Sequence, residues 1–223
     1  MATSVDKKRV VVVDDHPIVR RGIVQMINED SALTVVGEAA DVHEGLKVLE
    51  QQKPDIAVVD ISLKDSSGID LIKDAGIRWP KLPVIVFSMH DESFYAERVL
   101  RAGAKGYVTK GEPSVKMIEG IKRVLAGDIY VSERIASKML HKMVGGGVRT
   151  MDGFPIDSLS DREFEIFGLI GEGLQTRDIA DQLHLSVKTV ESHRENIKRK
   201  LNISNATELL QRAIHWVRFE RGS

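Results

Sequence analysis

Two patterns of apolar residues alternate through the first half of the chain. Short runs rich in β-branched residues occur at 9–14, 33–39, 55–60, 83–88 and 104–109. Such continuous apolar runs are typical of strands that are covered on both faces. Between them apolar residues recur at helical spacing, as in 18–27, where one side carries Ile18, Val19, Ile23, Met26 and Ile27. Five strands alternating with five helices predict an α/β fold, a doubly wound five-stranded parallel sheet of the flavodoxin-like kind.

The last part of the chain shows only helical patterns. We predict four short helices there, each with a polar residue at its start that can cap it. Ser160 is followed three residues later by Glu163, which is the signature of a capping box. The other candidate caps are Thr176, Ser186, and Ser204 or Asn205. The pattern predicts a small all-α domain of four helices.

A change of composition separates the two parts. Residues 132–143 predict one linker helix, and residues 145–155 contain Gly145, Gly146, Gly147, Gly153 and Pro155. Glycine at this density is typical of a flexible linker. We therefore predict a first domain at 1–127, a linker at 128–156 and a second domain at 157–223.

Composition narrows the class of protein. The 223 residues contain 42% hydrophobic and 29% charged residues, as in globular proteins of one or two domains. No apolar run approaches the roughly 20 residues that span a bilayer, and we see no secretory signal. The chain has no cysteine, so we expect neither disulfides nor thiolate chemistry, and the cytoplasm as its compartment. The formal net charge is −1, so any surface that attracts nucleic acid must be local.

Charged and polar residues stand where the predicted strands end. They are Asp14 and Asp15 after the first strand, Asp60 after the third, Ser88 after the fourth and Lys110 after the fifth. In a parallel sheet the carboxyl ends of the strands lie on one rim, and ligands bind there. A single aspartate at a strand end is more often a cap or a surface charge. Five such positions together predict a functional site.

The residue types at this rim suit phosphoryl chemistry. Two or three carboxylates and a carbonyl oxygen can hold Mg²⁺, and the ion would neutralise a phosphoryl group that approaches Asp60. Asp60 would then be a carboxylate nucleophile that gives an acyl phosphate. Lys110 would pair with the phosphoryl oxygens, and Ser88 would donate a hydrogen bond to them.

The order of these motifs resembles the receiver domain of two-component response regulators over residues 8–127. The segments that carry the resemblance are VVDDHPIVRRGI, DIAVVDISLKDSSGIDL, VIVFSMHDE and GAKGYVTKGE. The resemblance implies that Asp60 is phosphorylated by a sensor histidine kinase. It implies that Asp15 binds Mg²⁺ directly, Asp14 through water, and the Ser62 backbone carbonyl as a third protein ligand. It also implies that Tyr107 is a switch aromatic that moves with Ser88.

Two positions depart from the receiver pattern. Leu63-Lys64 stands where receivers usually have Met-Pro, which affects the conformation of the loop after Asp60. Lys110-Gly111 stands where many have Lys-Pro, which removes a rigid peptide after the lysine. Neither departure removes a reacting group.

Residues 159–203 resemble the LuxR-type helix-turn-helix. Joined to a receiver, this segment resembles the response regulators of the NarL/FixJ type over almost the whole chain. On the helix 187–201, Val190, Ile197 and Leu201 share one face, and Lys188, Ser192, Glu195 and Arg199 form the opposite one. Residues 187–200 hold five basic and two acidic residues, which is the local basic surface that the net charge conceals.

A helix of this kind binds in the major groove, where basic residues mainly contact phosphates. We assign phosphate contacts to Thr176, Arg177, Lys188, Thr189, Arg194 and Lys198. We assign base reading to Glu191, Ser192 and Glu195, because a glutamate can accept a hydrogen bond from cytosine N4. The two glutamates also repel phosphate, which should weaken non-specific binding.

We therefore expect a phosphorylation-activated regulator of transcription, not an enzyme. It would pair on activation as a homodimer and bind double-stranded DNA with repeated half-sites. A phosphohydrolase with an aspartyl-phosphate would need a second Asp where this chain has Ser62. A small-ligand sensor would need an aromatic cavity, and residues 1–126 contain few aromatics. A receiver that works without phosphorylation stays open as an alternative.

Overall fold

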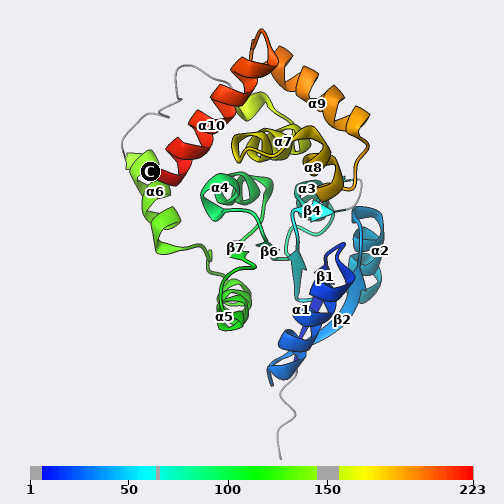
Figure 1. The fold of residues 1–223 in the computed structure, drawn as a ribbon. Coiled ribbons are helices and arrows are strands. Elements are labelled where there is room, and N and C mark those ends of the chain that lie inside the picture. Colours follow the sequence, from blue (N-terminus) through cyan, green and yellow to red (C-terminus); the bar gives the residue numbers. More distant parts are fainter. Residues whose placement is uncertain (1–6, 64–65, 145–155, 223) are drawn as a thin grey trace, which may run out of the picture. The chain divides into compact units, whose positions relative to one another are not determined.

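The computed structural model describes residues 7–63, 66–144 and 156–222 (Figure 1). Its contacts divide the chain into two compact units, Met1–Ala136 and Ser137–Ser223. The predicted glycine-rich stretch 145–155 lies outside the described residues. The domain boundaries given above remain predictions.

The first unit contains the predicted five-stranded parallel sheet. Its strands are β1 (Lys8–Val13), β2 (Leu33–Ala39), β3 (Ile56–Val59), β6 (Val84–Ser88) and β7 (Gly106–Thr109), in the order β2-β1-β3-β6-β7. The helices between and after them are α1 (Pro17–Glu29), α2 (Val42–Gln52), α3 (Gly68–Arg78), α4 (Glu92–Ala102) and α5 (Ser114–Leu125). The order reverses at β1 and β3, so the carboxyl ends of these strands flank the switch point of the doubly wound fold.

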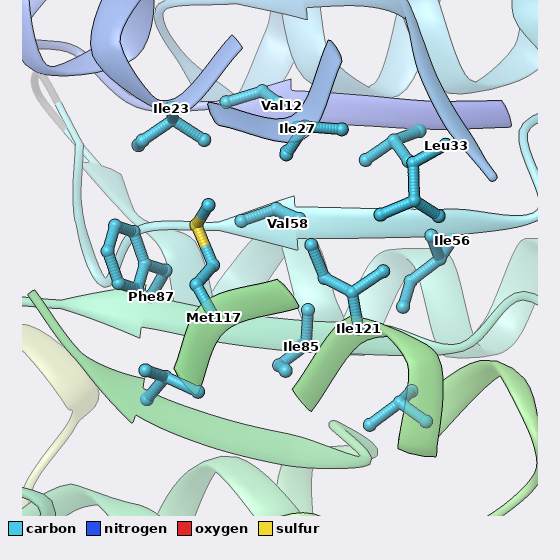
Figure 2. Packing of buried hydrophobic residues seen from close by; sticks show 13 residues of the cluster. Val12, Ile23, Ile27, Leu33, Ile56, Val58, Ile85, Phe87, Met117 and Ile121 are labelled. Atoms are coloured by element: carbon cyan, nitrogen blue, oxygen red, sulfur yellow. The ribbon is translucent and has the colours of Figure 1, made fainter. Parts of the chain in front are cut away.

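One face of the sheet packs against α1 and α5 (Figure 2). Ile23 and Ile27 of α1 and Met117 and Ile121 of α5 are buried on strand residues such as Val58. The predicted apolar side of α1 is wrong in its first turn, because Ile18 and Val19 are exposed. These two residues lie in the first turn of α1, whereas the buried residues of the helix are Ile23 and Ile27 further along it.

A short antiparallel hairpin follows Asp60, where no strand is predicted. Its strands are β4 (Ser62–Leu63) and β5 (Ser66–Ser67), and Leu63, the first residue of the departure from the usual Met-Pro pair, belongs to β4. Ser67 then caps α3 by accepting a hydrogen bond from the Ile69 N–H at 3.2 Å. The strands of the hairpin therefore lie between Asp60 and α3.

After α5 the chain returns to the edge of the sheet. The Tyr130 carbonyl accepts from the Tyr107 N–H at 2.8 Å, and the Tyr130 N–H donates to the Lys105 carbonyl at 2.9 Å. The linker helix α6 (Glu133–Val144) starts from there, and Ile135 in its first turn is buried. The first residues of the predicted linker thus pack on the first unit.

The second unit contains η2 (Ile156–Ser158), α7 (Asp161–Gly171), α8 (Thr176–Gln182), α9 (Val187–Lys200) and α10 (Ala206–Gly222). The predicted capping box of Ser160 and Glu163 is present, and Ser186 caps α9. Asn205 accepts from the Glu208 N–H at 2.9 Å at the start of α10. The predicted cap Thr176 is wrong, because Thr176 is the first residue of α8 and the N-cap position is held by Gln175, whose backbone N–H donates to Asp178 Oδ2 at 3.2 Å.

Aromatic rings join α7 and α10. Trp216 of α10 lies edge-on to Phe164, with ring centroids 5.2 Å apart, and 5.6 Å from Phe167. Val190 and Ile197 of α9 are fully buried, so α9 turns its apolar face inward as its sequence predicts. Among the described residues, none of the helices is both long and apolar enough for a membrane span.

Candidate functional site: an acidic cluster and a charged helix

Strands that are far apart in sequence bring the predicted acidic residues together. Asp14 and Asp15 follow β1, and Asp60 follows β3. One ligand atom from each of Asp14, Asp15, His16 and Asp60 lies within 4.8 Å of the others. We call these four residues the acidic cluster. The predicted convergence at the carboxyl ends of the strands is therefore present.

Lys110 joins two members of the cluster. Its Nζ donates to Asp14 Oδ2 at 2.6 Å and also to Asp60 Oδ2. The lysine follows β7, and its backbone N–H donates to the Ser88 carbonyl at 2.7 Å. Its side chain is only 6% exposed, so this ammonium group is neutralised inside the protein.

The backbone fixes the two carboxylates that Lys110 touches. Asp60 Oδ1 accepts from the Ile61 N–H at 2.7 Å, and Asp14 Oδ1 accepts from the His16 N–H at 2.8 Å. Each carboxylate therefore turns one oxygen toward its own chain and the other toward Lys110. Such hydrogen bonds hold a charged group in one orientation.

Burial shapes the electrostatics of the pair. It raises the pKa of the Asp60 carboxyl above its ordinary value, although the charge and hydrogen bond of Lys110 oppose the shift. Burial by itself lowers the pKa of Lys110, but the carboxylates of Asp60 and Asp14 outweigh it and leave the pKa raised. The lysine thus stays protonated, and it lies beside the Asp60 carboxyl, whose charged form is disfavoured by burial.

Gly68 leaves room for the backbone of Asp60. A Cβ atom at this position would stand 1.8 Å from the Asp60 carbonyl oxygen. The Gly68 N–H also donates to the Ile61 carbonyl at 2.7 Å. Only glycine permits this approach, which explains a glycine eight residues after Asp60.

The two predicted switch residues are buried near the cluster. Tyr107 is turned inward, and its hydroxyl donates to the His90 carbonyl at 2.9 Å. Burial raises its pKa well above the ordinary value, and the charge of Asp60 adds to the shift. The buried Ser88 hydroxyl has no hydrogen bond of good geometry within the described residues, although it is near enough to favour the charged forms of Asp60 and Tyr107.

Ser62 stands two residues after Asp60 in β4. Its hydroxyl is hydrogen-bonded to His90 Nε2 at 2.7 Å, so the hairpin is tied to the loop after β6. The ring of His90 packs on Tyr95 of α4, with centroids 4.6 Å apart. The role of the Ser62 carbonyl as a metal ligand remains a prediction.

One member of the cluster, His16, and a neighbouring residue, Arg20, were not predicted from the sequence. His16 Nδ1 lies 2.6 Å from Asp15 Oδ1, and Arg20 donates to the Asp14 carbonyl at 2.5 Å. His16 directly follows the aspartate pair, which was the available signal. Arg20 lies one turn into α1, and nothing in the sequence distinguished it from the exposed Arg21.

The donor atoms of the cluster suit a hard cation. Three of its four residues offer carboxylate oxygens, which are the ligands that Mg²⁺ prefers. Asp14 and Asp15 are adjacent in sequence, with side chains only 1% and 6% exposed, so their charges need a compensating cation. Lys110 offsets part of this charge at Asp14 and Asp60, and a divalent ion at Asp15 would offset the rest.

The predicted DNA-contacting residues of α9 lie on its outer side. Lys188, Glu191, Ser192 and Glu195 are exposed, whereas Thr189, Arg194 and Lys198 are half-buried. In α8, Arg177 is exposed and Thr176 is half-buried in the first turn. The structure therefore leaves the outer stripe of α9 open, as its pattern predicts.

Several of these side chains are already bonded within the unit. Lys198 pairs with Glu195 at 2.8 Å, and Lys200 pairs with Glu163 of α7 at 2.6 Å. The Ser192 hydroxyl donates to the Lys188 carbonyl at 3.0 Å, one turn back in the same helix. Part of the basic charge that the sequence counts on α9 is thus neutralised internally.

Comparisons with known proteins agree with this geometry. The family model "Response regulator receiver domain" matches residues 10–122, which include the whole acidic cluster. The model "Bacterial regulatory proteins, luxR family" matches residues 157–213, which include α7, α8 and α9. Each match falls within one of the two compact units.

Individual relatives cover nearly the whole chain. The oxygen regulatory protein NreC of Staphylococcus haemolyticus is 34% identical over 211 residues, covering 92% of this chain and 96% of NreC. RcsB of Salmonella enterica serovar Typhimurium, bound to promoter rprA in the presence of the phosphomimetic BeF₃⁻, is 28% identical, with a TM-score of 0.58 and coverage of 92% and 98%. A structure of two RcsB dimers bound to two parallel DNAs has 27% identity, a TM-score of 0.56 and coverage of 92% and 97%. The chain therefore belongs to the two-component response regulators of the NarL/FixJ type, in which a receiver domain is joined to a LuxR-type DNA-binding domain.

Proposed function

We propose that phosphorylation of Asp60 by a sensor histidine kinase, with Mg²⁺, activates this regulator of transcription. Activation would alter dimerisation or release the DNA-binding domain. The observation that carries the proposal is the buried Asp60 carboxylate, bonded to Lys110 and grouped with two further aspartates. A carboxylate that is held among compensating cations, rather than exposed, is suited to become a covalent intermediate.

In the proposed step, a carboxylate oxygen of Asp60 attacks the phosphorus of a phosphohistidine. The new O–P bond forms as the P–N bond breaks, and the histidine nitrogen keeps the electron pair. Lys110, already bonded to Asp60 Oδ2, would then face the phosphoryl oxygens. Ser88, whose buried hydroxyl makes no good hydrogen bond within the described residues, would donate one to the phosphoryl group.

Asp15, Asp14 and the Ser62 carbonyl would hold Mg²⁺, with Asp60 as a further ligand. The ion supplies positive charge that neutralises the phosphoryl oxygens. Asp15 is the member of the aspartate pair that Lys110 does not touch, which suits it to bind the metal directly. Tyr107 would pass the change from Ser88 toward the surface.

For DNA, we propose that α9 enters the major groove. Lys188, Arg194 and Lys198, with Thr189, Thr176 and Arg177, would contact phosphates, and Glu191, Ser192 and Glu195 would read bases. A homodimer would match two half-sites, as the dimers of RcsB on DNA suggest by similarity. We place the protein in the cytoplasm, because a regulator of transcription acts where the DNA is.

The decisive experiment adds acetyl phosphate and Mg²⁺ and measures the intact mass and the mass in solution. We expect one phosphoryl adduct in the wild type and in Asp70→Ala, since Asp70 is exposed on α3, and none in Asp60→Ala. An adduct with a monomer-to-dimer shift supports activation by pairing. An adduct without dimerisation supports release of the DNA-binding domain, and no adduct contradicts the proposal.

A further inference from the structure

Residues 130–135, which lead into α6 and include its first turn, are docked on the receiver by contacts on two sides. We call these residues the strap. On one side, Tyr130 forms a parallel bridge with Gly106 at the edge of the sheet. The fit is close, because a Cβ at Gly106 would stand 2.9 Å from the Tyr130 carbonyl oxygen. The strap is therefore closely packed on this edge of the sheet.

On the other side, the start of α4 holds the strap. Glu92 is only 8% exposed, and its Oε1 accepts from the Ser132 N–H at 2.8 Å. Arg134 lies 3.7 Å from Asp91, and Ile135 is buried. The Ser132 hydroxyl then caps the helix by accepting from the Ile135 N–H at 3.3 Å. The first turn of α6 is thus fixed to α4 by a nearly buried carboxylate.

Both anchors of the strap belong to the segments that carry the switch residues. Tyr107 donates its backbone N–H to Tyr130 in the strap and its hydroxyl to His90. His90 lies between Ser88 and Glu92 in the short loop that joins β6 to α4. A displacement of Ser88 would therefore be passed along residues 88–92 to Glu92, which binds the Ser132 N–H in the strap.

We propose that the strap transmits the state of the receiver to α6, with Glu92 as the coupling residue. The inference rests on the proposed phosphorylation of Asp60. When a phosphoryl group draws the Ser88 hydroxyl toward Asp60, the 88–92 loop follows, and Glu92 releases the Ser132 N–H. The first turn of α6 then loosens, and the helix from which the chain continues to the DNA-binding domain is freed from the receiver.

The test is hydrogen–deuterium exchange of α6 in the full chain, with and without BeF₃⁻ and Mg²⁺. We expect BeF₃⁻ to speed exchange in the first turn of α6 in the wild type. Glu92→Ala should show about tenfold faster exchange without BeF₃⁻, because the Ser132 N–H loses its partner, and BeF₃⁻ should add little. Glu92→Gln keeps an acceptor oxygen and should behave as the wild type.

Two further variants protect the test against a folding defect. Ser132→Ala keeps the N–H that Glu92 binds and should retain the response to BeF₃⁻. Tyr130→Ala keeps the backbone bonds to Tyr107 and Lys105 but removes a ring that packs on the hydrophobic core beside Gly120 of α5. It therefore weakens the packing of the strap on the sheet side while the bond to Glu92 stays available, and it should raise resting exchange as Glu92→Ala does. If both Glu92→Ala and Tyr130→Ala keep wild-type protection and response, the strap does not transmit the signal.

The adduct mass with acetyl phosphate is measured on the same samples. An adduct in the wild type with no change in α6 on BeF₃⁻ would overturn the role of the strap alone. Absence of an adduct would contradict the phosphorylation of Asp60, and the role of the strap would fall with it.

Discussion

The acidic cluster and helix α9 both contain many charged residues, but the carboxylates of the cluster are buried and many of the charged residues on α9 are exposed. In the cluster, carboxylates and Lys110 are almost fully buried and bonded to one another. On α9, the ion pair between Lys198 and Glu195 leaves the glutamate 72% exposed to solvent. Buried charges must be compensated by the fold, whereas exposed ones cost little to leave single. The charges of the first region are therefore coupled to stability, and the exposed charges of α9 can change with little effect on folding.

The largest expected effect is at the glycine that makes the cluster possible. Gly68→Ala places a Cβ 1.8 Å from the Asp60 carbonyl oxygen, and backbone cannot give way as a side chain can. We expect the receiver to lose its cooperative unfolding transition, beyond the about 1–3 kcal/mol that ordinary overpacking costs. Urea denaturation followed by the fluorescence of Trp79, in a Trp216→Phe background, measures the receiver alone.

Gly76→Ala is the matched control in the same helix. Nothing lies within 4 Å of the Cβ that it adds. Because alanine favours a helix over glycine, we expect this variant to be more stable by up to about 1 kcal/mol. A stable Gly68→Ala receiver would show that the close approach at Asp60 is dispensable.

Replacing Lys110 tests how much stability is lost when buried carboxylates have no partner cation. Lys110→Ala leaves Asp14 and Asp60 buried without their shared cation, and breaking a buried pair costs about 3–5 kcal/mol. Lys116→Ala also removes a lysine from an ion pair, with Glu119 at 3.2 Å, but both side chains are about half exposed. We expect a much smaller loss of stability there, because solvent screens an exposed pair. Equal losses of stability in the two variants would contradict the contrast between buried and exposed pairs.

The sequence predicts the first region better than the second, for a physical reason. Asp14, Asp60 and Lys110 follow strands, and a parallel sheet brings strand ends to one rim whatever the loops do. The partner of Lys200 is Glu163, 37 residues away in another helix. The spacing of residues within α9 therefore cannot show that the charge of Lys200 is already paired. The cap of α8 is Gln175 rather than the adjacent Thr176, because Gln175 and Asp178 bond reciprocally.

Other features depend on packing that no local pattern records. The hairpin of β4 and β5 has two-residue strands, too short for an alternation of apolar residues. The return of Tyr130 to the edge of the sheet depends on the space at Gly106. Ile18 is exposed in the first turn of α1, although its spacing fits the buried side of the helix.

A pH series tests the internal pairing of the second unit. Burial by itself raises the pKa of Glu163, but hydrogen bonds from Lys200 and Ser160 outweigh it and leave the pKa below its ordinary value of 4.5. The carboxylate therefore stabilises the fold above pH 4.5, and this stability is lost as the pH falls through the folded pKa. Glu163→Gln should cost about 1–3 kcal/mol at pH 7 and little at low pH.

The fluorescence of Trp216 in a Trp79→Phe background follows this unit during urea denaturation. Glu195→Gln is the control, because it breaks an exposed ion pair on α9 and should cost about 0.5 kcal/mol or less. A difference between Glu163→Gln and the wild type that stays constant from pH 7 down to low pH would exclude the ionised carboxylate as its source.

The smallest effect on stability, and the clearest on DNA, is expected from Lys188→Ala. Lys188 is exposed on the outer stripe of α9, whereas Lys200 is paired with Glu163. If Lys188 contacts a phosphate, its removal should weaken binding to all sequences alike and reduce the slope of log affinity against log salt by about one per subunit. Lys200→Ala should lower the stability of the unit and leave that slope unchanged. A salt titration of both variants on one duplex measures the two slopes. An unchanged slope in Lys188→Ala would contradict its phosphate contact. A slope reduced equally in both variants would mean that the internal pair opens on DNA, and that the charge of Lys200 is no more committed to the fold than that of Lys188.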